Sequence, residues 1–588
     1  MKSEQPIADP PLWRHRRGGP SVSRLLLAGL LAFFGAVLGA LAVLSDGVFM
    51  DDDLTHYLFA RWAWSDPLYF LDIWGRPGFT VPYALVAWIG DVSAGFTASR
   101  LLTVAIALGT AWLTADLARR LGDRRAWLAA LMLLCIPHYF ELSSTTLTET
   151  VCAFYIVLGV WGLRVGRVGL AAVAFGLVPL TRHEGILVPA IFGLWLLGRW
   201  DWRAMLLCAA PFLLWNLLCA LFSWQTPIGT YLRSNPQAGY YGSGGPLYYV
   251  LMAAQLLTPA GLGMLACGLL VLTGHSLFRR PRSAVGWLQL SRRQMSVLLT
   301  AGISVGIIVL NTLLYMFNFA ASGGYMRFLV PAAPLMAVCL SAGLQAWLGH
   351  LRGLPTGEEA VRRSPRAEGR VPLRTMGICF LAVLGLVGIE MVNQGLQHPD
   401  LVAGQLRQYS LVLLATLAAV AGACWSAGRG GRRAAGTVVV GTLVSLLASV
   451  SLVVRPWALA AEQLVVREAL EQLESDGHSS GAGILGHTPW VAYFTNQTLG
   501  MRDLQASRAW QNSGPGTLLF VDGNHTKREL GIPQSEPIET GLGRLIRGHD
   551  RLILVKPTDS RWFEQPYLRV YRRGEEALAP PTAGPPGR

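Results

Sequence analysis

Apolar runs separated by short charged segments extend over roughly the first three quarters of the chain. The first run, Leu25–Leu44, contains no charged residue, and about 20 apolar residues are enough to span a bilayer as a helix. Basic residues precede this run and acidic residues follow it, whereas a signal peptide has a shorter apolar core and a small-residue cleavage site. The pattern therefore predicts a retained first helix with its N-terminus in the cytoplasm.

The later apolar runs predict an α-helical polytopic membrane protein. Their lengths fit about 11 to 13 transmembrane helices, and the two shortest runs can instead form one bent unit. The expected spans after the first lie near residues 98–118, 126–141, 146–163, 168–181, 185–198, 204–222, 247–274, 295–317, 328–349, 375–393, 408–427 and 435–454.

Basic residues between the runs predict the orientation of the spans. They concentrate in every second connecting segment, which the positive-inside rule places in the cytoplasm. This asymmetry favours about 13 helices and puts the chain after Arg455 on the other side of the membrane. An excess of Arg over Lys, with abundant Ala, Gly and Leu, is typical of a GC-rich bacterial genome. We therefore expect a bacterial inner-membrane protein with a periplasmic or extracellular C-terminal domain.

Composition excludes several other classes. Charged residues make up 14% of the chain and apolar residues 52%, whereas soluble proteins carry about 25% charged residues. The net charge of +14 does not indicate nucleic-acid binding, because the basic residues lie between apolar runs. All eight cysteines lie within apolar runs and no CxxC pair occurs. Disulfides and thiolate metal sites are therefore not expected.

The chain changes character after residue 455 and predicts a small soluble α/β domain. Glu462–Leu473 has the pattern of an amphipathic helix, and short strand-like runs lie near residues 482–485, 517–521, 551–555 and 567–571. The predicted organisation is a disordered cytoplasmic N-terminus (1–20), a transmembrane domain (21–455), an extracytoplasmic α/β domain (456–575) and a disordered Pro- and Gly-rich tail (576–588).

The first external loop, residues 46–97, is the most informative segment. It begins SDGVFMDDDLTHYLFARWAW, so three consecutive aspartates follow a membrane helix, with a His-Tyr pair one helical turn later. A solvated acidic loop is the ordinary alternative. Carboxylates wedged between apolar segments are poorly solvated, however, which favours a functional site. The candidate residues of this loop are Asp51, Asp52, Asp53, His56, Tyr57 and the later Arg76.

Three further ionisable segments fall on the same expected face. Glu149 begins the fourth span, Arg182, His183 and Glu184 separate two short runs, and Arg327 opens a later span. Each has a structural alternative: helix capping for Glu149, a self-contained Arg182–Glu184 pair, and interfacial snorkelling for Arg327. Ionisable groups between membrane segments are nevertheless costly unless they are paired or functional.

This clustering at one membrane face favours an enzyme that acts on a lipid-borne substrate. Transporters place polar groups near the midplane and channels use rings or filters. Arginine suits a phosphate group, and a carboxylate suits a general base for an acceptor hydroxyl. A transferase of another lipid-carried group, a transporter or flippase of lipid-linked sugars, and a catalytically silent scaffold remain alternatives.

Several motifs carry a family resemblance over about residues 20–345. They include DDDLTHYLFARWAW, GRPGFTVPYALVAWIGDVSAGFTASRLLTV, ARRLGDRRAWLAAL, TLTETVCAFYIVLGVWGLR, PLTRHEGILV and YMRFLVPAAPLMAVCLSAGL. In order and character they resemble the GT-C superfamily of integral-membrane glycosyltransferases, which includes protein O-mannosyltransferases and bacterial lipid A aminoarabinose transferases. The resemblance implies transfer of a sugar from a polyprenyl-phosphate donor to a glycan, lipid or protein acceptor outside the cytoplasm, with inversion at the anomeric carbon.

The resemblance also implies roles for individual residues. The acidic motif corresponds to Asp51–Asp53, with Asp52 favoured as base or metal-binding acid, and Glu149 corresponds to a second acid. A divalent metal ion held by Asp52 and Glu149 is left open, because members of the superfamily differ in metal dependence. The substrate-binding candidates are Arg76, Arg182, His183, Glu184, Arg327, His56 and Tyr57, with Arg76 either binding phosphate or capping a turn.

Overall fold

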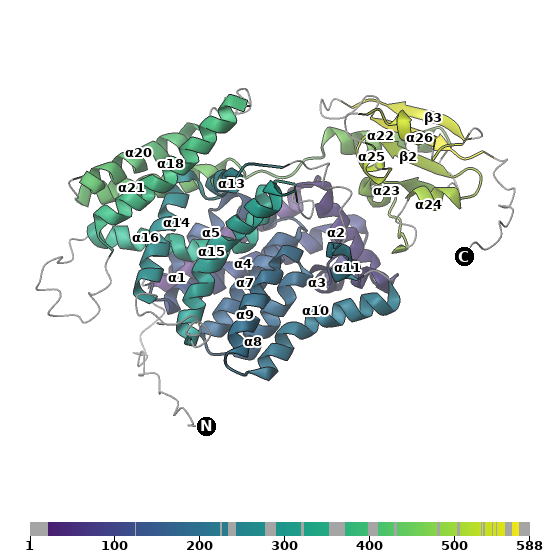
Figure 1. The fold of residues 1–588 in the computed structure, drawn as a ribbon. Coiled ribbons are helices and arrows are strands. Elements are labelled where there is room, and N and C mark those ends of the chain that lie inside the picture. Colours follow the sequence, from purple (N-terminus) through teal and green to yellow (C-terminus); the bar gives the residue numbers. More distant parts are fainter. Residues whose placement is uncertain are drawn as a thin grey trace, which may run out of the picture.

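The protein is described here by a computed structural model with side chains. A large helical body is followed by a small domain that contains a β-sheet, and the domain lies at one end of the body (Figure 1). The expected disordered ends, 1–20 and 576–588, lie outside the described residues. The structure describes residues 22–123, 125–223, 226–232, 243–276, 290–318, 323–351, 371–397, 410–428, 432–478, 483–501, 506–530, 532, 536–543, 545–547, 550–558 and 567–574.

Helices form the first half of the body. Most are built from uncharged apolar stretches, and α4 begins where Asp91 caps the backbone N–H of Ala94. In order, the elements are α1 (Val22–Leu44), α2 (Asp51–Trp62), η1 (Pro67–Phe70), α3 (Pro77–Ala87), α4 (Val92–Arg120), α5 (Trp127–Leu134), α6 (Pro137–Leu142), α7 (Thr148–Arg164), α8 (Val168–Leu177), η2 (Val178–Leu180), η3 (His183–Ile186), α9 (Leu187–Leu197), α10 (Trp202–Phe222) and α11 (Pro227–Leu232).

The second half of the body is also helical. Its first two helices meet at a bend of 99°, where Thr258 has a positive φ and a proline follows. The elements are α13 (Tyr248–Leu257), α14 (Pro259–Ser276), α15 (Arg292–Met316), η5 (Met326–Ala332), α16 (Ala333–Leu351), α18 (Leu373–Gln397), α20 (Ser410–Gly428) and α21 (Arg432–Ser451).

The helical membrane class predicted from the apolar runs is confirmed. Among the described residues, six helices are long and apolar enough to cross a membrane, or seven if the bent pair α13–α14 is one span. Other predicted runs contain apolar helices of 10–17 described residues, at Val168–Leu180, His183–Leu197, Leu373–Ile389 and Val412–Trp425. Some runs are broken. The run 126–141, for example, is divided at Pro137, after Ile136 adopts an extended conformation.

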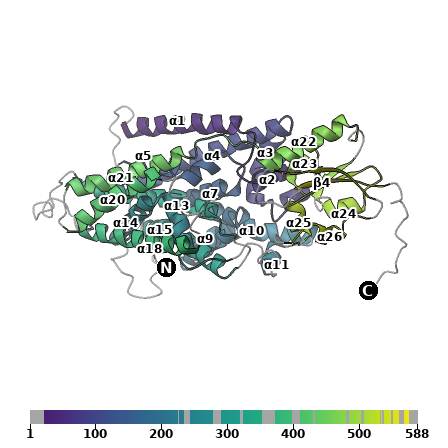
Figure 2. The same ribbon diagram turned by 90° about the horizontal axis from the view of Figure 1, so that it is seen from above.

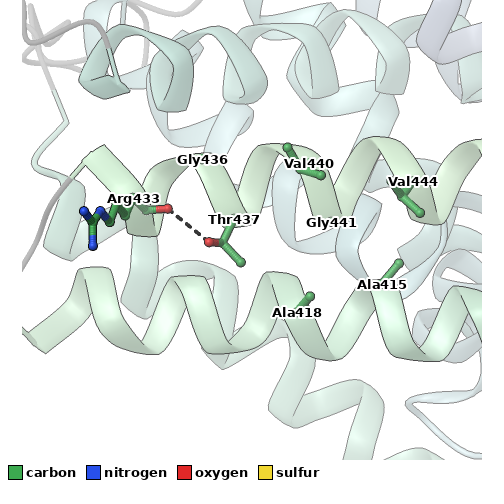
Figure 3. Close-up of a pocket in the computed structure, with 8 residues that line it drawn as sticks. All are labelled: Ala415, Ala418, Arg433, Gly436, Thr437, Val440, Gly441 and Val444. Carbon is green, nitrogen blue, oxygen red and sulfur yellow. Dashed lines mark hydrogen bonds between the residues drawn. The ribbon is translucent and has the colours of Figure 1, made fainter.

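Helices α20 and α21 lie against each other at the end of the body farthest from the sheet (Figure 1). Small residues allow this close approach, since a Cβ at Gly441 would lie only 2.7 Å from the carbonyl oxygen of Ala415. A groove of about 560 Å³ runs along the pair from Arg433 to Val444 (Figure 3). It lies in a different part of the fold from the ionisable residues of the first loop.

The C-terminal domain is the small α/β module that its sequence pattern predicts. Its sheet has the order β1-β2-β4-β3, in which β1 and β2 are parallel and the other pairs are antiparallel. The central β2 is buried along its whole length. The elements are α22 (Ala461–Ser475), β1 (Ile484–Gly486), α23 (Pro489–Phe494), α24 (Ala506–Gln511), β2 (Leu518–Asp522), α25 (His525–Glu529), α26 (Glu539–Leu542), β3 (Arg551–Lys556) and β4 (Leu568–Arg572).

One hydrophobic core joins this domain to the first loop of the body. Leu54 and Phe79, from α2 and α3, belong to the same buried cluster as Val466, Trp490 and Phe520. The view from above shows α2 and α3 next to α22 and α23 (Figure 2), and α2 contacts α23 directly. The domain therefore forms one packed unit with the loop that carries the three aspartates.

The crossing of α14 and α16 requires glycine at position 268. A Cβ there would overlap the carbonyl oxygen of Cys339, whereas a Cβ at Gly274 on the same helix meets nothing within 4 Å. We expect Gly268→Ala to destabilise the protein by about 1–3 kcal/mol through overpacking. Gly274→Ala is the matched control, because it makes the same change in helix propensity without the overlap. The measurement is the thermal unfolding midpoint of the detergent-purified protein, and equal midpoints for the two variants would contradict the prediction.

Candidate active site

Helix α2 begins at Asp51, so the three aspartates occupy its first turn. Carboxylates are favourable there, because the first backbone N–H groups of a helix lack partners within the helix and carry partial positive charge. Successive residues of a helix point about 100° apart, so the three side chains reach three different parts of the structure. Each aspartate consequently has its own set of partners.

Asp53 anchors α2 to the body. Its side chain is fully buried and accepts hydrogen bonds from the backbone N–H of Thr146, at 2.5 Å, and from the Thr146 hydroxyl. The guanidinium of Arg100 lies 4.0 Å away. Burial raises the pKa of this carboxyl, although Arg100 and the Thr146 hydrogen bonds oppose the shift. Tyr57, on the same helix, is also buried, and its hydroxyl donates to the carbonyl oxygen of Val92.

Asp51 connects α2 to the C-terminal domain. Its Oδ1 accepts from Trp490 Nε1 at 2.9 Å, and its Oδ2 lies 2.8 Å from His525 Nε2. Burial alone would raise the pKa of Asp51, but the two hydrogen bonds and the nearby imidazole hold it below its usual value. Burial would likewise lower the pKa of His525, and the Asp51 carboxylate reverses that shift and raises it. These two contacts were not predicted from the sequence.

Asp52 faces a group of buried arginines. Its Oδ2 accepts from Arg327 Nη2 at 2.6 Å, and Arg327 Nε lies 3.6 Å from Glu149 Oε1. Burial disfavours the Asp52 carboxylate, but the guanidiniums of Arg327 and Arg76 outweigh burial and lower its pKa. The side chain of Asp52 is 22% exposed, whereas those of Asp53 and Glu149 are 0% and 1% exposed. Among these three carboxylates, Asp52 is the one a substrate can reach.

Glu149 is shared between two arginines. It lies in the first turn of α7, and its Oε1 accepts from Arg182 Nη1 while also facing Arg327. Arg182 Nε donates to Glu184 Oε1 at 2.6 Å, and its guanidinium lies 4.5 Å from the ring centre of Phe328. The predicted Arg182–Glu184 pair therefore exists, but it is part of a larger network. Glu149 Oε2 is buried without a hydrogen-bond partner.

Arg76 is the one guanidinium of the group without a carboxylate partner among the described residues. It is 8% exposed, and its Nη1 donates to Thr148 Oγ1 at 2.7 Å and to the carbonyl oxygen of Thr181 at 3.3 Å. Its Nε is buried without a partner. Burial, and then the neighbouring Arg182, lower its pKa to about 10, so it stays charged at neutral pH. Buried charges are normally paired, so this arrangement suits an incoming anion.

Two backbone and ring features hold Arg76 in place. It occupies the position before α3 with a φ of 60°, a conformation that non-glycine residues rarely adopt and that often marks functional sites. Its guanidinium lies 5.5 Å from the ring centre of Trp74, which also stacks with the imidazole of His56. Burial and then Arg76 lower the pKa of His56 to about 3, so this imidazole is neutral. His183 lies nearby, with its ring roughly parallel to that of Trp215.

The structure thus brings together most of the residues that the sequence singles out. Sequence analysis did not identify the hydroxyl partners of Asp53 and Arg76. In the polar turn 143–148, Thr146 and Thr148 are buried and use their hydroxyls as hydrogen-bond partners. The residues that meet around Asp52 are His56, Arg76, Glu149, Arg182, Glu184 and Arg327.

The ligand set for a metal ion is incomplete here. Asp52 and Glu149 supply two carboxylates, and both are already paired with arginine. Within the described segments no group of three or more His, Cys, Asp and Glu side chains is placed to hold a metal. Divalent ions held by protein usually have more oxygen ligands than this. A divalent metal ion at Asp52 and Glu149 therefore stays an open prediction.

A protein-family model matches part of the chain. Residues 76–315, less than half of the sequence, match the model of glycosyltransferase family 87. The matched segment contains Arg76, Glu149 and Arg182 but neither the three aspartates nor Arg327. No curated protein matches the sequence.

Solved structures match over most of the chain. The apo crystal structure of ArnT from Cupriavidus metallidurans is 13% identical and has a TM-score of 0.52, with 94% of this chain and 99% of that chain covered. ArnT bound to undecaprenyl phosphate is 15% identical, with a TM-score of 0.49 and coverages of 93% and 97%. The archaeal oligosaccharyltransferase AglB from Archaeoglobus fulgidus is 11% identical, with a TM-score of 0.44 and coverages of 84% and 69%.

At this identity the apo ArnT match shows a shared fold. The fold, the membrane helices and the family 87 match agree with one another. The chain therefore has the fold of ArnT, a helical membrane protein, and its residues 76–315 are similar to glycosyltransferase family 87.

Proposed function

We propose that this protein is a membrane glycosyltransferase that moves a sugar from a polyprenyl-phosphate donor to an acceptor on the extracytoplasmic side of the membrane. The observation that carries the proposal is Arg76, a buried guanidinium that has no carboxylate partner among the described residues. A phosphate oxygen would satisfy both its charge and its free Nε–H. The positive-inside pattern of the loops and the position of α2 after the first membrane helix support the extracytoplasmic side.

Arg182 and Arg327 would complete the phosphate site. Both lie beside Glu149, and each keeps N–H groups that can turn toward a second anion. A phosphate leaving group departs as an anion, so positive charge around it stabilises the transition state more than a general acid would. In this arrangement Glu149 positions the two guanidiniums rather than reacting itself.

Asp52 is the proposed general base. In the free enzyme its ion pair with Arg327 keeps the pKa low and makes the carboxylate a weak base. A donor phosphate competes for Arg327, and when that guanidinium turns toward the phosphate, the pKa of Asp52 rises. Donor binding would thus activate the base and couple the two substrates.

The reaction balances with these groups alone. The acceptor hydroxyl gives its proton to Asp52 as its oxygen forms the new bond to the anomeric carbon. The bond from that carbon to the phosphate oxygen breaks, and polyprenyl phosphate leaves between Arg76, Arg182 and Arg327. Attack by the acceptor oxygen on the face opposite the leaving group inverts the anomeric carbon. The sugar is either a hexose or a pentose, and the acceptor a glycan, a lipid or a protein.

Replacing the base tests the proposal against the flippase alternative. We expect Asp52→Asn to reduce sugar transfer by about 10²- to 10⁴-fold, the usual contribution of a general base, while the donor still binds. The measurement is the turnover of lipid-linked sugars by protein in lipid nanodiscs, alongside donor binding. Asp46→Asn is the matched control, because Asp46 is exposed on the same loop. Transport of the lipid across vesicles without any sugar transfer would instead support a flippase.

We expect Arg76 to favour donor binding and catalysis while lowering the stability of the folded protein. We expect Arg76→Met to lower kcat/KM for the donor by about 10- to 100-fold, because a charged hydrogen bond is worth about 1.5–3 kcal/mol. The unfolding midpoint should stay level or rise, since an unpaired buried charge is removed. The control is Arg61→Met, which should lower the midpoint and leave the donor KM unchanged, because Arg61 donates to the backbone carbonyls of Ala87 and Gly90. A lower midpoint with normal kinetics for Arg76→Met would show a structural role.

The Asp52–Arg327 ion pair should determine how kcat/KM depends on pH. The carboxylate must be ionised to act as a base, so activity is lost as the pH falls through the pKa of Asp52, which lies below the ordinary value. Removing the guanidinium raises that pKa, so Arg327→Gln should shift the acid limb of kcat/KM to higher pH. Arg327→Lys keeps the charge and should keep the limb low. An acid limb that does not move in Arg327→Gln would exclude Asp52 as the titrating base.

A further inference from the structure

His525 connects the C-terminal domain to the first turn of α2. Its Nε2 lies 2.8 Å from Asp51 Oδ2, and the two side chains are 15% and 29% exposed. The two residues are 474 positions apart in the sequence and meet because the domain packs on α2 (Figure 2). The proposed base and phosphate site do not include His525, so any effect of this residue on sugar transfer must be exerted through Asp51.

Backbone hydrogen bonds hold this imidazole in place within the domain. Asp522 is fully buried at the end of β2, and its Oδ1 accepts from the backbone N–H groups of His525, at 2.5 Å, and Asn524, at 2.9 Å. The Thr526 hydroxyl in turn accepts from the backbone N–H of Asp522 at 3.0 Å. These bonds attach the start of α25 to the central strand of the sheet. A side chain carried by such a packed and hydrogen-bonded scaffold keeps its direction.

The first turn of α2 depends on contacts from outside the helix. Its N-cap residue, Met50, makes no side-chain capping hydrogen bond. The ends of a helix tend to fray, and partners from elsewhere in the protein then fix the position of the terminal turn. Asp51 and Asp52 are consecutive in this turn, so a displacement of Asp51 also moves Asp52.

Transfer depends on the direction of Asp52, since a displacement of about 1 Å at a reacting group can reduce a rate by about 10²-fold. We infer that His525 is a positioning residue for the transfer reaction: by holding Asp51, it fixes the first turn of α2 and thereby directs the Asp52 carboxylate toward the acceptor hydroxyl. This inference rests on the proposed function. The C-terminal domain then contributes to catalysis through α2.

The contact between His525 and Asp51 should depend on pH. Burial alone would lower the pKa of His525, but the hydrogen bond with Asp51 and the neighbouring Asp522 carboxylate raise it above its usual value. The imidazole therefore keeps its charge to a higher pH than an ordinary histidine, and it loses that charge as the pH rises through this pKa. The hydrogen bond to Asp51 then weakens, because charged partners make the stronger hydrogen bonds. The charged and titratable groups around the pair are Asp52, Asp522, Arg528, Glu462 and Tyr567.

Two amide substitutions separate the reach of His525 from its charge. The amide of glutamine extends about as far as Nε2, whereas the amide of asparagine is one methylene shorter, and both remove the titrating group. We expect His525→Asn to lower kcat by about 10- to 100-fold, the range expected when one hydrogen bond to a charged group is lost. The donor KM should change by less than about threefold, because the arginines of the phosphate site are untouched. His525→Gln should retain most of the wild-type kcat at neutral pH in full-length protein in lipid nanodiscs.

The matched control is Tyr69→Phe, which removes a different hydrogen bond between the same loop and the same domain. Tyr69 donates to the carbonyl oxygen of Leu499 at 2.9 Å. Its loss should lower the unfolding midpoint and leave kcat unchanged, because the first turn of α2 keeps its contacts. If Tyr69→Phe and both His525 variants lower kcat in proportion to their loss of stability, His525 has only a structural role and the inference is overturned.

Two further measurements report on positioning. The wild-type kcat should decline at alkaline pH as His525 loses its charge, and His525→Gln should lack this decline. Hydrogen exchange of residues 51–62, followed by mass spectrometry, should be faster in His525→Asn than in the wild type and close to the wild-type rate in His525→Gln. The inference is overturned by an alkaline decline that persists in His525→Gln, or by exchange and kcat in His525→Asn that equal those of the wild type.

Failure of the proposed function would give a different result. If the wild type releases no polyprenyl phosphate from lipid-linked hexoses and pentoses, the proposed function fails whatever the exchange rates are. If the wild type transfers sugar and His525→Asn transfers it equally fast, the positioning role alone is wrong. If His525→Asn does not fold, as its unfolding midpoint would show, the pH profile of His525→Gln decides.

Discussion

Burial of charge is the constraint on which this structure depends. A guanidinium or carboxylate removed from water loses several kcal/mol of solvation, which only close partners of opposite charge return. Asp52, Glu149 and Glu184 provide such partners for Arg182 and Arg327, and the shared network fixes the relative positions of α2, α7 and η5. Arg76 has no carboxylate partner in the described chain, and its guanidinium donates only to neutral oxygens, of Thr148 and Thr181. The donor phosphate of the proposed function would supply the missing negative charge.

The three aspartates in the first turn of α2 contact different parts of the structure. Asp53 fixes the helix to the body through Thr146, and Asp51 fixes it to the C-terminal domain through Trp490 and His525. With both neighbours anchored, the backbone around Asp52 is held rigidly and its side chain remains accessible. A functional group supported on both sides by hydrogen-bonded residues keeps its orientation, which catalysis requires.

The C-terminal domain packs directly against the membrane body. It shares a hydrophobic core with α2 and α3, and its Trp490 and His525 contact the Asp51 side chain.

Local patterns in the sequence determined the protein class, the small α/β domain and the segments that carry ionisable groups. Apolar run length decides whether a segment prefers lipid, and residues four apart share a helix face, so these features need no knowledge of distant contacts. The tertiary structure alone decided which partners each aspartate has. The partners that distinguish them lie far away in the chain: Arg327 is 275 residues from Asp52, and His525 is 474 residues from Asp51. The absence of a carboxylate beside Arg76 within the described chain is likewise a property of packing, because sequence spacing does not reveal which buried charges meet.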